Sequence, residues 1–562
     1  MPRAAASTTR YNFNRLPATV RRPPDPPDMA RDLPCYSVAD QGALAALRAV
    51  LRAAVGVRPA RVHALSRTYY DTPDRRLYRA GRVLELIERR GERSLLLRAL
   101  GNARALATQA IAAPPRFARD LPEGTLQEKL AALAGPRVLL PVARVRSRVT
   151  PLSVLDKQGQ VAFVLELDEA RLQNGARVAD QALGCWVRVD DEGDGARKLR
   201  ERVQSLIEGH EGVEDPTRDP FEAALAAGAE PAPADLARPK VVLEPAIVGT
   251  AAVARVLGAY FRTLDANEGG VVADLDIEFL HDFRVATRSS RSVLNRMRAV
   301  FPEREHEKAC ADLAWLGKIT GPKRDLDVFL GELDEHMARL PSLWRPHIDP
   351  LRAYLGRQRR VEHGRLVEVL TSERYRGFKR DYPVWLARAA RRRVPQNGPG
   401  AGRAVDLASR TIWRADHTLL SEGFAVMEDT PVEALHELRK TGKKLRYLLE
   451  AFQSLYRPDA VRQVVGELKH LQDCLGAIVD RDVQRRLLRH FGDALALQDQ
   501  VPNETGVAMK MLEAVLWEEE QVHRATFDAC WERFARPRTR RLFRTLFGPV
   551  AGTGGAYGAR SM

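Results

Sequence analysis

The chain has 562 residues, of which 45% are hydrophobic, enough for more than one buried core. Lys and Arg number 89 against 73 Asp and Glu, a formal net charge of +16, so polyanions are the expected partners. The five cysteines are far apart and never form a C-x-x-C pair, which argues against a disulfide framework or a zinc knuckle. Because no apolar run reaches signal-peptide or membrane-spanning length, we expect a cytoplasmic protein without a membrane partner.

Residues 1–30 are rich in arginine and proline, which predicts a disordered basic leader. Residues 31–210 have the mixed pattern of an α+β domain, with a helix at 41–55 and a closing helix at 197–208. Strand patterns lie between them, at 82–88, 94–98, 161–169 and 185–190.

Residues 68–74 read TYYDTPD, followed by Leu77 and Gly81, and this stretch resembles a CYTH domain, the antiparallel tunnel of the triphosphate tunnel metalloenzymes. The resemblance implies an antiparallel sheet. Active members carry E-x-E-x-K on the first strand, because a metal-dependent triphosphatase needs carboxylates that hold Mg²⁺ or Mn²⁺. The corresponding stretch, about 31–36, lacks that motif. We therefore expect a degenerate domain with no catalytic residues and no cofactor, and Mg²⁺ or Mn²⁺ only if the domain is active.

Arg144, Arg146 and Arg148 alternate along one predicted strand of this domain, so they share one strand face. That row is a possible phosphate-binding surface, and a solvated face is the alternative. Residues 211–240 are rich in proline, alanine and acidic residues and are predicted to be a linker. From 241 to 548 the periodicity is helical, with breaks expected at prolines that include Pro322 and Pro383, and 549–562 form a tail.

Two histidine-led stripes dominate the helical region. The first consists of His281, Arg284, Arg288 and Arg291, and the second of His436, Arg439, Lys443 and Arg446. In each, cations follow the histidine at +3, +7 and +10, which places the four side chains within an arc of roughly 80° on a helix. Like charges so spaced repel by about 0.2–0.5 kcal/mol per pair. The stripes therefore predict a multivalent anion as the missing counter-charge.

The second stripe follows the first by 155 positions, and other residues recur at the same offset. Asp325 recurs as Asp480 and Asp327 as Asp482; we interpret these acids as helix caps or as partners that hold arginines. The constant offset predicts a duplicated helical unit, with repeat 1 at about 245–393 and repeat 2 at about 403–545. Two such units pack most simply about a pseudo-twofold axis, so that both stripes face one cavity.

Residues 281–288 (HDFRVATR) and 435–447 (LHELRKTGKKLRY) resemble the two signatures of the CHAD family, the conserved histidine α-helical domains. Residues 323–328 (KRDLDV) and 471–476 (LQDCLG) follow the family's order, so the resemblance covers about 300 residues. It implies two four-helix bundles related by pseudo-twofold symmetry, a basic cavity that binds inorganic polyphosphate, and association with polyphosphate granules.

All eight stripe residues are assigned to polyphosphate contact. Arginine offers a fork that bridges two phosphate oxygens, whereas lysine and histidine are single-point donors. Secondary candidates, for which a solvated-surface role is an equal alternative, are Arg255, Lys318, Lys323, Arg324, Arg410 and Lys444. Three other functions stay open: nucleic-acid binding by the basic helices, a metal-dependent tri- or polyphosphatase in the CYTH-like domain, and helix faces that are merely salt-bridged. The oligomeric state is not predicted.

Overall fold

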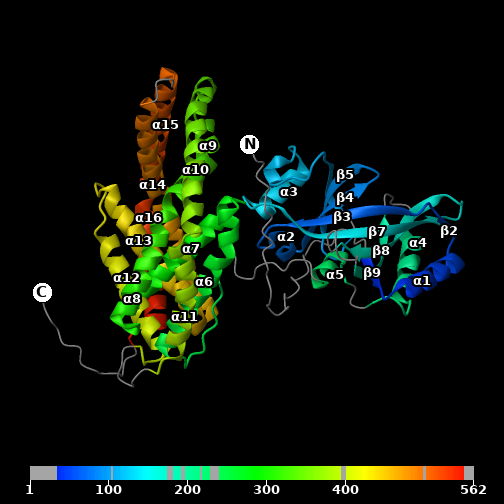
Figure 1. Ribbon diagram of the computed structural model, residues 1–562, viewed down its shortest axis with the longest axis horizontal. Helices are drawn as coiled ribbons and strands as arrows, with labels where there is room; N and C mark the ends of the chain where they lie inside the picture. The colour runs from blue at the N-terminus through cyan, green and yellow to red at the C-terminus, as the bar shows by residue number, and fades with distance from the viewer. Residues whose placement is uncertain are drawn as a thin grey trace. The chain divides into compact units, whose positions relative to one another are not determined.

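The computed structural model describes residues 35–102, 105–173, 181–190, 197–214, 218–227, 239–393, 400–497 and 502–549. The expected leader at 1–30 and all but the first residue of the expected tail lie outside the described residues. The chain divides between residues 232 and 233 into two compact units. Their elements are labelled in Figure 1.

The described part of the N-terminal unit contains a nine-stranded antiparallel sheet, which confirms the expected α+β fold. Its strands are β1 (Cys35–Val38), β2 (Val57–Pro59), β3 (His63–Asp71), β4 (Arg82–Arg89), β5 (Glu92–Ala99), β6 (Ala105–Ala110), β7 (Leu140–Leu155), β8 (Val161–Leu172) and β9 (Gln181–Asp190). They lie in the order β1-β9-β8-β7-β3-β4-β5-β6, with β2 paired to β7. The helices are α1 (Gln41–Ala54), α2 (Arg76–Arg79), α3 (Thr125–Ala134), α4 (Arg197–Glu208) and α5 (Pro220–Ala226).

Helices α1 and α4 cover one face of this sheet. The side chain of Asp40 caps α1 by accepting a hydrogen bond from the backbone N–H of Ala43 at 2.8 Å. Leu47 of α1 and Ile207 of α4 are fully buried and share a core cluster with Leu165 of β8. The burial of apolar side chains between helix and sheet therefore fixes the curvature of the long central strands.

The segment predicted to be a linker, 211–240, contains α5, which packs into the N-terminal unit. Phe221 is buried, with ring centroids 5.2 Å from Tyr69 and 5.8 Å from Tyr78. Asp219 caps α5 and forms a buried ion pair with Arg98. An aromatic anchor and a buried charge therefore override the linker-like composition, and residues 228–238 lie outside the described residues.

The C-terminal unit is all-α, as expected. Its helices are α6 (Gly249–Val272), α7 (Ile277–Arg296), α8 (Glu303–Ile319), α9 (Gly321–Ala338), α10 (Asp349–Leu370), α11 (Glu373–Arg391), α12 (Ala404–Phe424), α13 (Val432–Phe452), α14 (Pro458–Ala496), α15 (Asn503–Arg524), α16 (Phe527–Ala535) and α17 (Pro537–Phe547). At an offset of 155 positions, α6 corresponds to α12, α7 to α13 and α10 to α15. The duplication read from the sequence therefore extends to the helix boundaries.

Proline explains where the two halves differ. Pro322 lies in the first turn of α9, where its missing N–H costs little, and separates α8 from α9. The equivalent position is Ala477, and there the single 39-residue helix α14 runs on without a break. Conversely, Pro537 starts α17 and separates it from α16, whereas the corresponding stretch of the first half is the single helix α11.

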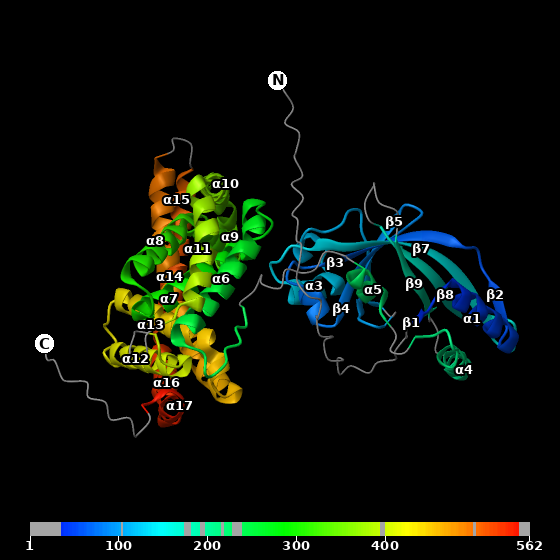
Figure 2. The ribbon, with the colours of Figure 1, turned by 60° about the horizontal axis from the view of Figure 1, so that its bottom comes forward.

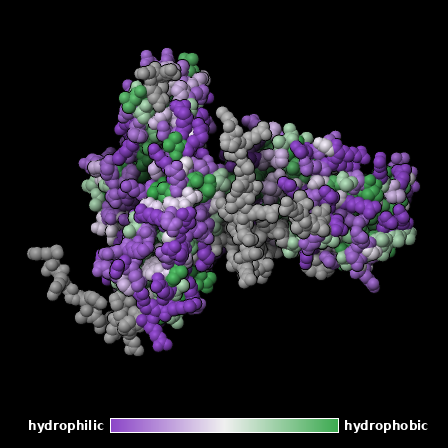
Figure 3. Space-filling model, viewed as in Figure 1, coloured by the Kyte–Doolittle hydropathy of each residue, from purple (hydrophilic) through white to green (hydrophobic). Residues whose placement is uncertain are grey.

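Helix α7 packs against α6 and α13 near the centre of this unit (Figure 2). The α9–α10 and α14–α15 hairpins share a separate core that includes Phe329, Leu351, Phe491 and Leu512. The outward face seen in Figure 3 is mostly hydrophilic, consistent with apolar side chains turned inward. Among the described residues, no helix combines the length and apolarity needed to cross a membrane.

Candidate anion-binding site

Both stripes lie on the helices that pack together at the centre of the C-terminal unit. Helix α7 begins after Asp276, whose carboxylate accepts hydrogen bonds from two backbone N–H groups of the first turn, and α13 begins after Pro431. Phe283 on α7 and Leu445 on α13 are fully buried, so the apolar faces form core as expected. All eight stripe residues are half-buried, which places them at the border between that core and solvent.

The first stripe is held by neutral groups. Nη1 of Arg284 donates to the carbonyl oxygen of Gly317 at 3.1 Å and to the hydroxyl of Thr320 at 2.9 Å. Arg288 and Arg291 make no hydrogen bond and no ion pair with any described residue, and the buried Nε of Arg288 has no partner there. His281 occupies the first turns of α7. The charges of Arg284, Arg288 and Arg291 are therefore not matched by any described acid within ion-pair distance.

The second stripe has more acidic neighbours. His436 Nε2 lies 3.2 Å from Asp482 Oδ2, and Nη2 of Arg439 donates to Asp480 Oδ2 at 3.0 Å. Arg446 Nε lies 3.5 Å from a Glu450 oxygen. The interpretation of Asp480 as a partner that holds an arginine is confirmed by this contact.

Lys443 connects the two stripes. Burial, together with the charges of Arg439 and, from the other helix, Arg288, lowers the pKa of its ammonium from 10.5 to about 8. Similarly, burial and the neighbouring Arg288 lower the pKa of the Arg284 guanidinium to about 10. These shifts mean that the cations feel one another across α7 and α13. We call Arg284, Arg288, Arg439 and Lys443 the basic basin.

Two glycines at the repeat offset leave space beside the basin arginines. A Cβ atom on Gly476 would lie 3.3 Å from Nη2 of Arg439, and one on Gly321 would lie 3.6 Å from Nη1 of Arg284. The first distance is tighter than ordinary contact, so a side chain at Gly476 requires a small shift of the Arg439 guanidinium, whereas the second distance is an ordinary contact.

Comparisons with known proteins identify this region. Residues 255–489 match the family model described as the CHAD domain. The chain carries a CHAD domain. The Mycobacterium tuberculosis protein MT2285 is 30% identical over 215 residues, which are 37% of this chain and 39% of that protein. The chain therefore spans well under half of that relative's length.

Solved structures resemble each unit separately. The CHAD domain of the plant Ricinus communis is 24% identical, with a TM-score of 0.45, over 56% of this chain and 97% of that one. An adenylyl cyclase homologue from Hippeastrum, described as having a dominant triphosphatase activity, is 14% identical, with a TM-score of 0.24, over 34% and 94%.

One secondary candidate, Lys323, is not available to a ligand. Its side chain is 2% exposed, and Nζ lies 2.8 Å from Asp327 and 3.1 Å from Asp274. Arg359 closes the network with contacts of 2.7 Å to both of these acids. Lys323 therefore belongs to a buried ion network of the CHAD domain. The i,i+4 spacing of Lys323 and Asp327 is the sequence signal for this pair.

The other secondary candidates divide by location. Arg324 donates to the backbone of Ile277 at 3.2 Å, and burial, with Arg288 nearby, lowers its pKa, so it borders the basin. Lys444 is half-buried next to Lys443. The candidates with exposed side chains are Arg255, which pairs with Glu244 at 2.7 Å, Lys318 and Arg410.

Arg144, Arg146 and Arg148 share one face of β7, as the alternation predicts, but it is the outer face. All three are exposed, while Ser147 and Val149 between and beside them are buried on the inner side. The row therefore lies on a solvent-exposed face, and phosphate binding by it stays a prediction. Alternation in the sequence predicts which residues share a face of the strand. It does not predict which of the two faces is the concave, inner one.

The inner face of the sheet instead carries Arg67, Arg98 and Arg188, which the sequence interpretation missed. Arg98 contacts Glu85 at 2.5 Å and Asp219 at 2.6 Å, and Arg67 contacts Asp168 at 2.6 Å. Burial opposes the charge of Arg98, but Asp219 and Glu85 raise its pKa well above the usual value. Three acids thus match three arginines in this interior.

Proposed function

We infer that the CHAD domain binds inorganic polyphosphate in the basic basin and that the protein acts as a binding protein without a cofactor. One observation carries this: Arg288, on one repeat, lowers the pKa of Lys443 on the other, and neither side chain has an ion-pair partner among the described residues. Holding such cations together raises the free energy of the empty site, and a multivalent anion relieves that cost.

The basin offers phosphate two kinds of donor. Arg284, Arg288 and Arg439 present planar forks that match pairs of phosphate oxygens, while Lys443 supplies a compact ammonium. His281 and His436 at the beginning of each stripe are single-point donors. Polyphosphate carries about one charge per phosphate along a flexible chain, so one polymer would neutralise both stripes.

The surroundings of the stripes favour phosphate over nucleic-acid bases. The faces beside them are occupied by buried apolar side chains such as Leu280 and Leu435, which are committed to the core. Sequence-tolerant binding of single strands relies instead on aromatic platforms beside the cations. Association with polyphosphate granules is the cellular consequence that we propose.

The described residues do not favour the metal-dependent alternative. Among them, no group of three or more His, Cys, Asp or Glu side chains is arranged to hold a metal ion. Three acids inside the sheet, Glu85, Asp168 and Asp219, are instead paired with arginines. We therefore propose binding rather than hydrolysis.

Competition tests the proposal. Long-chain polyphosphate and single- or double-stranded DNA are titrated against the full chain at equal phosphate concentration and physiological salt. We expect polyphosphate to displace DNA, and Arg288→Gln to weaken polyphosphate binding by about tenfold because it removes one charge-assisted contact. The control is Arg538→Gln, on the exposed face of α17. Displacement of polyphosphate by DNA would favour the nucleic-acid function instead.

A further inference from the structure

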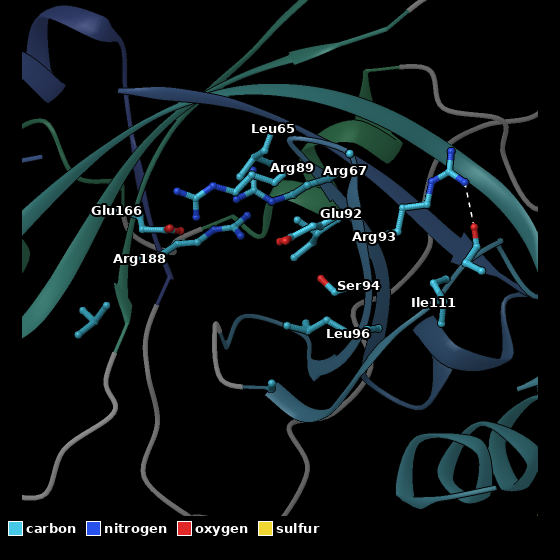
Figure 4. A pocket seen from close by; sticks show the side chains of 16 residues that line it. Leu65, Arg67, Arg89, Glu92, Arg93, Ser94, Leu96, Ile111, Glu166 and Arg188 are labelled. Carbon is cyan, nitrogen blue, oxygen red and sulfur yellow. Dashed lines mark hydrogen bonds between the residues drawn. The ribbon is translucent and has the colours of Figure 1, made fainter. Parts of the chain in front are cut away.

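The sheet of the N-terminal unit encloses a cavity of about 1010 Å³ that the CHAD domain function does not use (Figure 4). Its apolar lining includes Leu65, Ile87 and Leu96. Leu65 and Ile87 lie beside Arg67 on neighbouring strands, whereas Leu96 lies on the other side of the cavity, and Arg188 points into it with Glu166 close by (Figure 4). The lining thus combines hydrocarbon side chains with guanidinium groups.

Arg188 is the unusual member of this lining. Its side chain is 11% exposed, yet the buried Nε and Nη2 have no hydrogen-bond partner among the described residues. The nearest carboxylate oxygen, on Asp168, lies 3.7 Å from Nη2, which is too long for a hydrogen bond. A buried guanidinium with unmet donors needs an acceptor, because leaving such a donor unpaired is costly.

The charge of the lining sets how much negative charge that acceptor carries. Of the lining arginines, Arg67 and Arg93 are paired with acids, at 2.6 Å to Asp168 and 2.7 Å to Glu88. Arg89 and Arg188 remain, and Glu92 and Glu166 line the same cavity. The remaining charges balance, so a triphosphate with several negative charges would be left largely uncompensated in a partly buried space.

We propose that this cavity binds a small organic anion with a single negative head group, which accepts hydrogen bonds from Arg188, and an apolar body, which lies against Leu65, Ile87 and Leu96. A carboxylate matches the fork of a guanidinium, and the apolar lining gains from covering a hydrocarbon chain. This ligand class differs from the metal-bound triphosphates that the CYTH resemblance implies. The site is independent of the polyphosphate site proposed above.

The test uses the full chain and octanoate as the probe. Isothermal titration compares octanoate with octan-1-ol, which has the same chain length and no charge, and with tripolyphosphate plus Mg²⁺. We expect octanoate to bind at one site, and Arg188→Met to weaken it at least about tenfold through loss of the charge-assisted contact. Arg144→Met, on the outer face of β7, is the matched control and should leave binding unchanged.

A second variant keeps the test decisive if Arg188→Met does not fold. Leu96→Trp fills part of the cavity and removes no charged group, so it should abolish octanoate binding while polyphosphate binding remains. The proposal is overturned if octanoate binds no better than octan-1-ol, if Leu96→Trp binds octanoate normally, or if tripolyphosphate with Mg²⁺ occupies the cavity in preference.

Discussion

Arginine is buried in two contrasting ways in this molecule. Inside the sheet, Arg98 meets Glu85 and Asp219 within 2.6 Å, and its pKa is raised. In the basic basin, Arg284 meets only a carbonyl and a hydroxyl, and burial lowers its pKa to about 10. Arg98 is buried, whereas Arg284 is half-buried. The two arginines also differ in counter-charge, because Arg98 has acids within ion-pair distance and Arg284 has none among the described residues, which marks the basin as a candidate anion site.

The same contrast recurs on a smaller scale within the CHAD domain. The first stripe leaves Arg288 and Arg291 without an acidic partner among the described residues, whereas the second pairs Arg439 with Asp480. The two halves share helix boundaries and an offset, but they differ in how much free charge they present. The cations that have no acidic partner should therefore contribute more to polyphosphate affinity than those that have one.

The largest expected effect comes from reversing charge where the stripes meet. Arg288→Glu combined with Lys443→Glu removes two charge-assisted contacts, each worth about 1.5–3 kcal/mol, and adds repulsion. Polyphosphate affinity should fall by more than about a hundredfold in a binding titration. The matched control reverses Arg538 and Arg541 on exposed α17, which changes the net charge equally. Equal losses in both variants would mean that net charge, not the basin, holds the polymer.

In the sheet, by contrast, we expect substitutions to change stability and not polyphosphate binding. Glu85→Gln leaves Arg67 and Arg98 undercompensated in the interior, which should destabilise the N-terminal unit by about 3–5 kcal/mol. Hydrogen exchange of β4 and β5 peptides measures the loss. Glu88→Gln, whose pair with Arg93 is exposed, should cost at most about 1 kcal/mol. If the two variants cost the same, the buried network has no special role in this unit.

Much of this contrast was not readable from the sequence. Both stripes, the repeat and the all-α fold follow from periodicity, which records which side of a helix a residue occupies. The pairing of Arg98 with Asp219 spans 121 positions and joins a strand to a segment that reads as linker. Periodicity carries no information on such contacts. Lys323 is a different case, because its i,i+4 spacing to Asp327 is visible in the sequence but the burial of the pair is not.

Helix breaks show a similar limit. Proline was expected to interrupt helices at Pro322 and Pro383; α9 does start at the first, but α11 continues through the second. Pro383 is flanked by Tyr382, which is buried and packs against Phe261 and Phe378. Tertiary packing of that aromatic cluster holds the helix together where local propensity alone would end it.

An intermediate effect should appear in the pH dependence of binding. The pKa of Lys443 is about 8 in the empty basin, and an anion favours its charged form, so binding takes up a proton above that pH. Affinity should fall as the pH rises above 8, by at most about tenfold per pH unit. Lys443→Arg keeps its charge and should flatten the profile between pH 7.5 and about 9.5. An unchanged profile in Lys443→Arg would assign the titration to another group.

The smallest effect should come from Asp480, the acid that already occupies one side of the basin. Its contact with Arg439 competes with phosphate for the same guanidinium, so Asp480→Asn should tighten polyphosphate binding. Because the carboxylate is half exposed, its pair is worth about 0.2–1 kcal/mol, which corresponds to a gain of up to about fivefold. Asp459→Asn at the exposed start of α14 removes the same charge and serves as control. A loss of affinity in Asp480→Asn would instead mean that the acid orients Arg439 for the ligand. The second stripe would then be preorganised by its acids and not weakened by them.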